Sequence, residues 1–207
     1  MNNIKNNLPQ KLHSILIGLM LSDGSLYRSS PTANVRFELS FGEKYKELAF
    51  YIGEMFNAYM SNPVKSVEIK GKNKVYVNYR LKTKTLPVFN SYYEMFYKFN
   101  HLTNKYVKIV PDNILDLMDP IVLAYLIQGD GNFDKSRNRV RIYTNSYQKL
   151  EVENLALAIK TKLNIYTAPL HDRKDQWILT IGANNLDLLR KIVIPYFHPT
   201  MYYRLGL

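Results

Sequence analysis

The hydrophobic positions form two predominantly apolar runs of helical length, one near the N-terminus and one just past the middle. The first run, residues 13–22, leads into Asp23 and Gly24, and the second, residues 120–129, leads into Asp130 and Gly131. Apolar runs of this length that end at Asp-Gly predict buried helices that stop there. Because the two aspartates lie 107 positions apart, about half of the 207 residues, the pattern predicts an internal repeat.

Each run is followed by the same succession of patterns. Residues 35–40 and 139–143 alternate apolar and polar side chains, which predicts strands with one buried and one solvated face. A helix is then expected in each half, followed by two strands joined by a turn and by a further helix. The expected ranges are 43–59, 64–70, 74–82 and 86–98 in one half and 147–162, 164–171, 176–182 and 184–194 in the other, with turns at 71–73 and 172–175.

Both successions read helix-strand-strand-helix-strand-strand-helix, and they meet between Pro111 and Pro120. We therefore expect an α+β fold of two αββαββα half-domains, residues 1–112 and 113–207, related by a pseudo-twofold axis. The glycine after each aspartate is expected to end its helix in the left-handed conformation.

The amino-acid composition excludes several classes of protein. The chain is 46% hydrophobic, enough for a core, and its lack of cysteine excludes disulfide scaffolds, zinc ribbons, iron–sulfur sites and thiol nucleophiles. No apolar run approaches the ~18–20 residues of a membrane span, and the Asn- and Lys-rich start does not resemble a signal peptide. We expect no membrane partner.

The formal net charge is +11, and 17 residues are tyrosines. This excess favours a polyanionic partner, most simply nucleic acid, although lysines that only aid solubility would give the same total. The charge is uneven, with +8 in residues 1–112 and +3 in residues 113–207.

The predicted strands carry the basic residues on one face. Lysines there can neutralise phosphates, while arginine and asparagine can contact base edges. A single strand of this kind could be an ordinary solvated edge, but four at matched positions favour a DNA-binding surface. The candidate DNA-binding residues are Arg28, Arg36, Glu38, Ser40, Lys70, Lys72, Lys74, Tyr76, Asn78, Arg80, Lys82, Lys135, Arg137, Arg139, Arg141, Tyr143, His171, Arg173, Lys174 and Gln176.

Asp23 and Asp130 stand at helix ends that already carry partial negative charge. Asp-Gly is also a common turn, so either pair alone has a simpler explanation. Two at matched places would converge if the helices pack side by side, and a divalent cation would offset their charge. Oxygen ligands without His or Cys favour Mg²⁺, and such a site beside a basic groove suits phosphodiester hydrolysis.

The segments 16–24 and 123–131 resemble two copies of the LAGLIDADG motif. Over about residues 10–207 the chain is similar to the single-chain, double-motif homing endonucleases encoded by organellar introns. The resemblance implies that the motif helices form a central two-helix interface, with two or three Mg²⁺ ions between the half-domains. It further implies saddle-shaped antiparallel sheets in the major groove of a long asymmetric DNA target, a double-strand break with short 3′ overhangs, and intron mobility.

The resemblance also implies roles for residues of the motifs. Asp23 and Asp130 would ligate the metals, with contributions from the carbonyls of Ser22 and Gly129. Asn145 matches a polar residue that arranges water in relatives, and Ser40 is the nearest candidate for its counterpart in the first half.

Lys108, in the segment 108–111, and Arg204, near the C-terminus, match the family's basic residue beside the reacting phosphate. Such a cation stabilises charge in the transition state, although either residue alone could be an ordinary surface cation. Arginine is a departure from lysine and cannot accept a proton at ordinary pH. The third motif position is Gly18 in one helix and Tyr125 in the other, which predicts asymmetric packing or a cleft for the ring.

Two other functions remain open: an RNA maturase that assists splicing of its own intron, with intron RNA as partner, and a catalytically inactive DNA-binding protein. The presence of both aspartates and both basic residues favours cleavage. A composition rich in Asn, Lys, Ile and Tyr fits an A+T-rich gene, so we expect a monomer encoded in a mitochondrion or another organelle.

Overall fold

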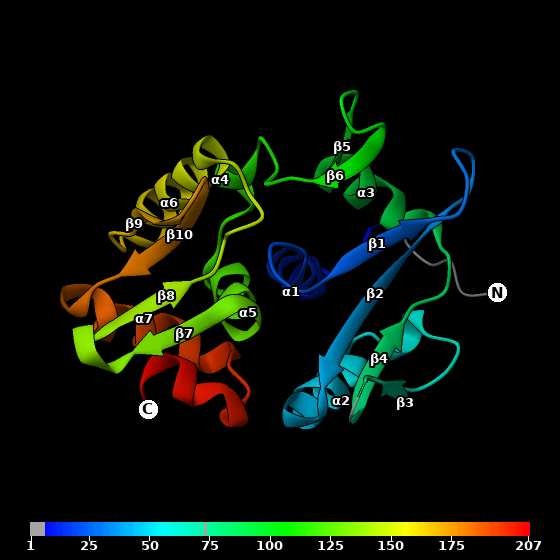
Figure 1. Ribbon diagram of the computed structural model, residues 1–207, viewed down its shortest axis with the longest axis horizontal. Coiled ribbons are helices and arrows are strands. Elements are labelled where there is room, and N and C mark those ends of the chain that lie inside the picture. Colours follow the sequence, from blue (N-terminus) through cyan, green and yellow to red (C-terminus); the bar gives the residue numbers. More distant parts are fainter. Residues whose placement is uncertain (1–6, 73) are drawn as a thin grey trace. The chain divides into compact units, whose positions relative to one another are not determined.

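The computed structural model describes residues 7–72 and 74–207 as a mixture of helices and antiparallel sheets (Figure 1). The chain forms two compact units, one of Met1–Leu12 with Asp23–Met95 and one of His13–Ser22 with Phe96–Leu207. No helix of the described residues is long and apolar enough to cross a membrane.

The first unit contains a four-stranded antiparallel sheet in the order β1-β2-β4-β3. Its strands are β1 (Ser25–Arg28), β2 (Val35–Gly42), β3 (Lys65–Lys70) and β4 (Val75–Lys82). Helix α2 (Lys46–Met55) packs on β2 and β4, and α3 (Asn90–Phe96) follows the sheet in the chain. Short 3₁₀ turns at Glu43–Tyr45, Asn57–Tyr59 and Pro87–Phe89 flank these helices.

The second unit repeats this topology, with strand order β7-β8-β10-β9. The strands are β7 (Gly131–Asp134), β8 (Arg139–Ile142), β9 (Ala168–Arg173) and β10 (Gln176–Ile181). The helices are α4 (Ile114–Leu117), α5 (Pro120–Asp130), α6 (Lys149–Leu163) and α7 (Leu186–Val193), and 3₁₀ turns cover Lys135–Arg137, Ala183–Asn185, Ile194–Tyr196 and Pro199–Leu205. The shared strand order confirms the predicted repeat and the α+β fold.

The alternation read from the sequence places the core correctly. In β2, Val35, Phe37 and Leu39 are buried while the residues between them reach solvent, and in β8 Val140 and Ile142 are fully buried. Each sheet therefore has one apolar face, which its helices cover, because period two sends successive side chains to opposite faces.

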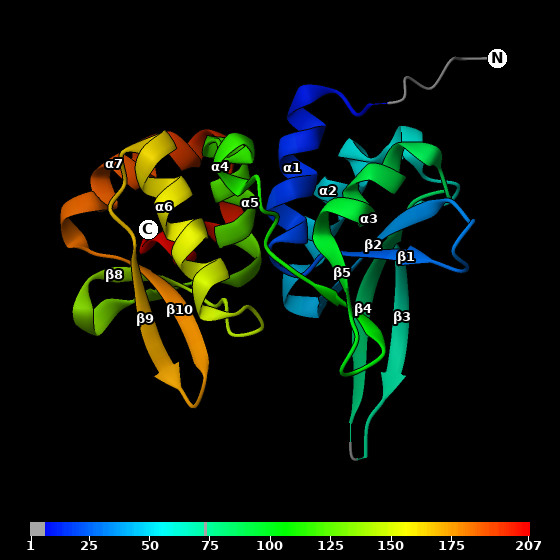
Figure 2. The same ribbon diagram turned by 90° about the horizontal axis from the view of Figure 1, so that it is seen from above.

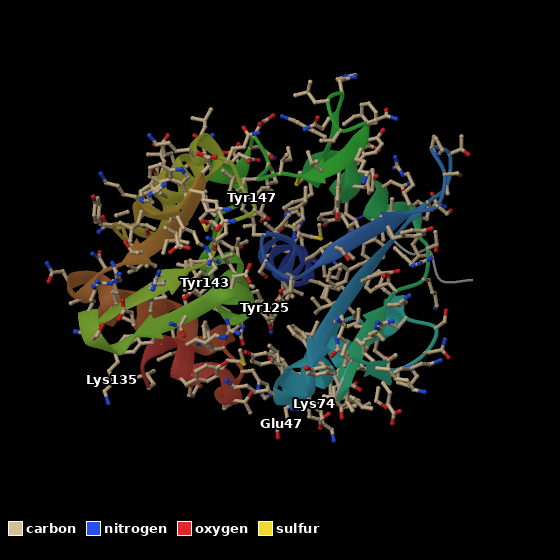
Figure 3. All side chains as sticks on the ribbon, viewed as in Figure 1. Glu47, Lys74, Tyr125, Lys135, Tyr143 and Tyr147 are labelled. Carbon is tan, nitrogen blue, oxygen red and sulfur yellow. The ribbon has the colours of Figure 1, made fainter. Side chains whose placement is uncertain are left out.

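The first motif lies at the end of α1 (Gln10–Met20), whose residues from His13 onward pack on α5 in the second unit. A Cβ atom on Gly18 would lie 2.6 Å from the Val122 carbonyl oxygen and 2.7 Å from Cβ of Tyr125. The glycine of one motif thus makes room for the tyrosine of the other, which is 2% exposed (labelled in Figure 3). The tyrosine is therefore accommodated in the packing of the two helices, and the asymmetry expected from these two residues stays a prediction.

A polar contact fixes the other end of the same helix pair. Asp119 caps the N-terminus of α5 by accepting a hydrogen bond from the backbone N–H of Val122 at 2.8 Å. The Ser14 hydroxyl of α1 donates to the same carboxylate at 2.5 Å. The cap of one motif helix is therefore shared by the other.

Some elements differ from the prediction. The helix expected to run to residue 98 ends at Phe96 and is followed by an unforeseen hairpin of β5 (Tyr97–Asn100) and β6 (Lys105–Lys108). Strand β9 begins at Ala168, and it extends to Arg173, so the turn expected at 172–175 is shorter and uses a left-handed Lys174 with φ 49°. The turn expected at 71–73 includes Asn73, which lies outside the described residues.

The expected left-handed glycines are wrong. Gly131 is extended, with φ −80° and ψ 153°, and the glycine with a left-handed φ among the described residues is Gly206. Gly131 is instead required by space, since a Cβ atom there would lie 2.4 Å from the Ile127 carbonyl oxygen.

The compact units do not divide at residues 112 and 113. Residues 13–22 belong with the second unit because α1 packs on α5. The β5–β6 hairpin, which precedes residue 112, also belongs with the second unit. The half-domain boundary at 112 and 113 stays a prediction about the sequence repeat, whereas the packing of the first motif helix places the division of the fold elsewhere.

Candidate active site and nucleic-acid interface

The two motif aspartates occupy the ends of their helices in slightly different ways. Helix α1 ends at Met20 and continues as a turn, in which the N–H of Ser22 donates to the Leu19 carbonyl at 3.1 Å, before the exposed Asp23. Helix α5 includes Asp130 as its last residue, and this carboxylate is partly exposed. Both carboxylates therefore follow a helix C-terminus closely, as the sequence predicted.

The two predicted basic residues make matching contacts. The Lys108 ammonium donates to the Ser22 carbonyl at 2.6 Å, and the Arg204 guanidinium donates to the Gly129 carbonyl at 2.6 Å. In each motif the accepting carbonyl belongs to the residue immediately before the aspartate. The structure thus brings each cation to the same backbone position of its own motif.

These contacts have a physical reason. The last carbonyls of a helix have no intrahelical partner and carry partial negative charge, which a cation stabilises. A carbonyl oxygen has two lone pairs, so Ser22 and Gly129 each retain acceptor capacity beside the cation. The predicted use of these carbonyls by a metal is compatible with the contacts.

The two cations differ in their surroundings. Arg204 is 8% exposed and also donates to the Gly131 carbonyl at 2.5 Å, so its guanidinium brackets Asp130 along the backbone. Lys108 is partly exposed. Arg204 therefore holds the backbone around its aspartate, and Lys108 retains more access to solvent.

A buried tyrosine that the sequence did not single out also lies here. Tyr147, 4% exposed and labelled in Figure 3, donates its hydroxyl to the Leu21 carbonyl at 3.1 Å. Burial, and to a smaller extent the negative charge of Asp130, raises the pKa of Tyr147 well above its usual value. The hydroxyl therefore stays protonated and acts as a donor that satisfies the end of α1, and only the tertiary contact distinguishes it from the other tyrosines.

The ligand chemistry of the motifs suits a hard divalent cation. Among residues 7–72 and 74–207, no group of three or more His, Cys, Asp or Glu side chains could hold a metal ion. Each motif offers one carboxylate and one backbone carbonyl, and every donor is oxygen. Mg²⁺ accepts few protein oxygens and keeps water or substrate phosphates as its other ligands, so the residues present fit such an ion.

Asp23 also lines a hollow of about 360 Å³ in the first unit. Predicted DNA-binding residues of β2 and β4 share this hollow: Glu38, Ser40, Arg80 and Lys82. The first unit therefore joins its motif carboxylate to the polar face of its sheet, which is the continuity that a nuclease site needs between phosphate chemistry and base contacts.

Strand register defines the polar face of the first sheet. Glu38 lies opposite Lys82, Ser40 opposite Arg80, and Arg80 opposite Lys65 on the next strand. We call this surface the open face; its members include Lys65, Tyr76, Asn78, Arg80 and Lys82 with Arg36, Glu38 and Ser40. Strands β3 and β4 carry it along a hairpin that extends beyond the helices of this unit (Figure 2).

Side-chain contacts organise the open face. Arg36 forms an ion pair with Glu38 at 2.5 Å, and Lys82 approaches the same carboxylate at 3.6 Å. The Asn78 amide donates to the Ser40 hydroxyl at 3.2 Å. Glu38 thus holds two cations in place, which orients them without removing the net positive charge of the face.

Three basic residues of this sheet lie on faces that the sequence did not predict. Arg28 follows Leu26 on the helix-covered face and pairs with Glu94 at 2.7 Å, so it does not belong to the open face. Lys70 pairs with Val75 and also points away from the open face. Lys65, which the sequence reasoning left out, lies on the open face because β3 and β4 pair in this register.

The remaining predicted lysines of this hairpin, Lys72 and Lys74, are exposed near its turn. The Lys74 ammonium lies 5.6 Å from the ring centroid of Tyr76. Both cations are placed where a phosphate could reach them.

The second sheet pairs its arginines with two aspartates that the sequence reasoning missed. Arg139 and Arg137 lie 3.1 and 3.8 Å from Asp134. A hydrogen bond from Ser136, and then the Arg139 guanidinium, hold the pKa of Asp134 below its usual value. Asp134 therefore stays ionised and orients Arg139 of β8 and Arg137 of the preceding 3₁₀ turn.

Asp172 performs the same role further along the sheet. It lies 3.4 Å from Arg141 and accepts a hydrogen bond from the Asn145 amide at 3.0 Å. Asn145 also donates to Gln176 at 3.2 Å, and Arg173 donates to the same amide oxygen at 3.1 Å. Asn145 is thus held in a polar network with candidate DNA-binding residues.

The other candidate DNA-binding residues of this unit lie in three kinds of place: against a helix, beside an arginine, and at turns. His171 packs edge-on against Trp177, which also lies beneath Lys149 of α6, so the histidine faces the helix rather than the arginines. Tyr143 lies 5.5 Å from the Arg141 guanidinium, while Lys135 and Lys174 are exposed at turns. Tyr143 and Lys135 are labelled in Figure 3.

Known proteins resemble the chain in sequence. The family model of the LAGLIDADG DNA endonuclease family matches residues 13–189. The intron-encoded endonuclease ai4 of Dictyostelium discoideum is 32% identical over 159 residues, which cover 73% of this chain and 94% of that protein. The cytochrome b mRNA maturase bI2 of Saccharomyces cerevisiae is 26% identical over 100% of this chain, which spans 50% of the length of that maturase.

Solved structures share the fold. The homing endonuclease I-WcaI, bound to its DNA recognition sequence, has a TM-score of 0.84 at 23% identity, over 96% of this chain and 87% of that one. I-DmoI in complex with DNA and Mn has a TM-score of 0.54 at 17% identity, over 89% of this chain and 97% of that one. With the family model matching most of the sequence and both motifs present, the chain belongs to the LAGLIDADG DNA endonuclease family.

Proposed function

We propose that this chain is a site-specific DNA endonuclease that makes a double-strand break with short 3′ overhangs in a long asymmetric target. The observation that carries the proposal is the matching pair of cation contacts, from Lys108 to the Ser22 carbonyl and from Arg204 to the Gly129 carbonyl. These contacts stabilise the helix ends, and they also place one cation beside each motif aspartate, where it can stabilise the charge that develops on a reacting phosphate.

In this proposal Asp23 and Asp130 hold divalent cations, with Mg²⁺ as the physiological ion and two or three ions in all. The carbonyls of Ser22 and Gly129 assist them. A bound divalent ion would supply an activated water and stabilise the leaving oxygen. A relative by fold was solved with DNA and Mn, which supports the use of a divalent ion.

The side chains of this protein have distinct parts in the reaction. Lys108 stabilises negative charge that develops at the phosphate, because its ammonium is partly accessible. Arg204 fixes the backbone on both sides of Asp130 through its two carbonyl contacts. Asn145 and Ser40, each within a hydrogen-bonded pair of side chains, are the candidates for arranging water.

We infer that duplex DNA lies on the polar faces of the two sheets. The open face of the first unit supplies lysines for phosphates and Arg80 with Asn78 for base edges. In the second unit Arg139 and Arg141, held by Asp134 and Asp172, serve the same purpose. The relative I-WcaI was solved bound to its DNA recognition sequence, which supports DNA as the partner.

A second candidate function is RNA maturation. The match to the cytochrome b mRNA maturase bI2 covers all of this chain and half of that maturase. Splicing of an intron RNA is therefore proposed as an additional or alternative role. The chain would act as a monomer encoded within an organellar intron, such as a mitochondrial one. The relative named as an intron-encoded endonuclease supports this origin and a role in intron mobility.

The central test replaces each motif aspartate by asparagine and follows cleavage in Mg²⁺ of a DNA library that contains the intronless host-gene junction. Asp23→Asn or Asp130→Asn should abolish double-strand cleavage and leave DNA binding within about twofold, since the change removes a metal ligand without altering volume. Asp187→Asn, which alters an exposed carboxylate on α7, is the matched control and should cleave normally.

Cleavage that survives both substitutions would contradict the metal role of the aspartates. Loss of DNA binding by a variant that folds normally would count against it as well, because the proposal separates catalysis from recognition.

A further inference from the structure

The β5–β6 hairpin belongs to neither copy of the repeated topology. Strands Tyr97–Asn100 and Lys105–Lys108 form their own two-stranded sheet, separate from both four-stranded sheets. The hairpin is the green loop at the top of Figure 1. Only its last residue, Lys108, takes part in the function proposed above, so the rest of the hairpin needs its own explanation.

Aromatic side chains cluster on one face of this hairpin. Phe99 and Tyr106 are cross-strand partners, with ring centroids 5.3 Å apart, and they are 40% and 57% exposed. The His101 ring lies 5.0 Å from Phe99, and Leu102 at the tip is 97% exposed. Single exposed apolar residues are ordinary, but neighbouring exposed rings on one small ribbon indicate a surface that receives a partner.

The turn that carries this cluster is well structured. The Asn100 side-chain oxygen accepts hydrogen bonds from the backbone N–H groups of Leu102 at 2.9 Å and Thr103 at 3.1 Å. Asn104 adopts the left-handed conformation, with φ 53°. These turn contacts hold the two strands in register, so the rings are presented in a fixed arrangement before any partner binds.

The charges around the rings are mostly positive. Lys108 shares the face of the rings, whereas Lys98 and Lys105 lie on the other face of the ribbon, where Lys98 pairs with Asp112 at 2.8 Å. Lys105 lies at the tip end of the ribbon and is exposed. Exposed rings on one face of a narrow ribbon, with an exposed lysine at its tip, suit a partner that offers both flat π-faces and negative charge, which are the properties of unpaired bases on a phosphate backbone.

Whether the bases are paired decides which form of nucleic acid can stack on these rings. In duplex DNA the base faces are stacked on one another and are closed to a protein ring, whereas single-stranded loops of RNA expose them. We propose that the β5–β6 hairpin, which is separate from both four-stranded sheets, binds an unpaired segment of RNA by stacking bases on Phe99 and Tyr106. The proposal deepens the maturase candidate and does not rest on DNA cleavage.

The test measures binding of the full chain to a labelled single-stranded RNA of roughly ten nucleotides by fluorescence anisotropy. The Phe99→Ala, Tyr106→Ala double variant should bind this RNA about tenfold or more weakly than the parent. Its binding to duplex DNA of the same length should stay within about twofold. Both rings are solvent-exposed, so the variant should fold normally, which a thermal melt verifies.

Tyr166→Ala is the matched control. Tyr166 is 60% exposed and lies beside Lys160, so this variant removes an exposed ring near a lysine at a different place in the same unit. It should bind the RNA as the parent does. Lys105→Ala should bind the RNA more weakly in low salt, which provides a second measurement that leaves the rings in place.

Unchanged RNA binding by the double variant would overturn the proposal. Equal losses for RNA and duplex DNA would also overturn it, because the hairpin would then belong to the duplex surface. Preference of the parent chain for single-stranded DNA over RNA of the same sequence would reject RNA as the partner. These outcomes can be told apart from failure of the endonuclease proposal, which the aspartate variants test separately.

Discussion

Arg204 shows how a departure from the family pattern can be explained by contacts of one residue. A lysine has a compact ammonium, whereas the guanidinium is a planar fork of donors. Arg204 uses this geometry to reach the carbonyls of both Gly129 and Gly131, on either side of Asp130. The sequence indicated that a cation belongs here, but it did not indicate that the cation would be buried and bound to the backbone.

Gly18 supports a residue-scale prediction. Its missing Cβ allows α1 to approach Val122 and Tyr125 within 2.7 Å of where that atom would lie, and both obstructing atoms belong to the helix backbone or its first side-chain carbon. Gly18→Ala should therefore destabilise the fold by about 1–3 kcal/mol, because neither neighbour can move away cheaply. Urea unfolding monitored by circular dichroism measures this change.

Gly182→Ala is the control, since nothing lies within 4 Å of the added atom and the backbone there is extended. It should leave the free energy of unfolding within about 0.5 kcal/mol of the parent. Equal stability of Gly18→Ala and the parent would mean that the two motif helices do not pack as closely as described.

At the scale of elements, strand alternation and strand register contributed different information. Alternation along residues 74–82 correctly separated the apolar side of β4 from its polar side. The sequence could not assign Lys65 and Lys70 to faces, because the face of a residue on β3 depends on its partners on β4. Lys65 pairs with Arg80 on the open face, and Lys70 pairs with Val75 away from it.

This difference gives a matched pair of charge-removing variants. Arg80→Ala should weaken binding to the cognate duplex by about 1–3 kcal/mol if the guanidinium contacts a base edge, and should relax preference at that base pair. Lys70→Ala removes the same charge from the other face and should change affinity by much less. A competition assay with single-base-pair variants of the target measures both effects.

Equal weakening by the two variants on every sequence would show that only total charge matters. Uniform weakening by Arg80→Ala alone would instead make that residue a phosphate contact.

At the scale of the whole molecule, the net charge of +11 indicates where a polyanion could bind only once the charged side chains are placed in the fold. Cations of the second sheet are paired with Asp134 and Asp172, and in the first sheet Glu38 holds two of the cations. These acidic residues orient the basic ones, so part of the formal charge organises the surface. Exposed lysines of the first sheet, such as Lys65 and Lys74, point into solvent, where phosphates can reach them.

Binding to duplex DNA should consequently weaken steeply with salt. If about six phosphates are neutralised, the affinity should fall on the order of a thousandfold between about 50 and 200 mM salt, because bound cations release the counterions of the DNA. A plot of log affinity against log salt concentration, obtained at constant pH, gives the slope. An almost flat plot would rule out the sheet faces as the main DNA surface.

The sequence by itself determined the repeat, the fold class, the two motif aspartates and the apolar face of most strands, because these depend on periodicity and on local helix and strand physics. It could not determine the β5–β6 hairpin, because strands of four residues are too short for a period of two to stand out against the helix expected there. Nor could it identify Tyr147 as a cap on α1 or Asp172 as the partner of Arg141.

Those features depend on contacts between residues far apart in the chain, so only the tertiary structure decided them. Gly18 illustrates the division. The sequence showed a glycine and a tyrosine at the same position of the two motifs, whereas the packing of α1 on α5 showed that Val122 and Tyr125 occupy the space that a Cβ atom on Gly18 would need. Local periodicity specifies which side of an element is buried, whereas the identity of the atoms that cover it is settled when the elements pack.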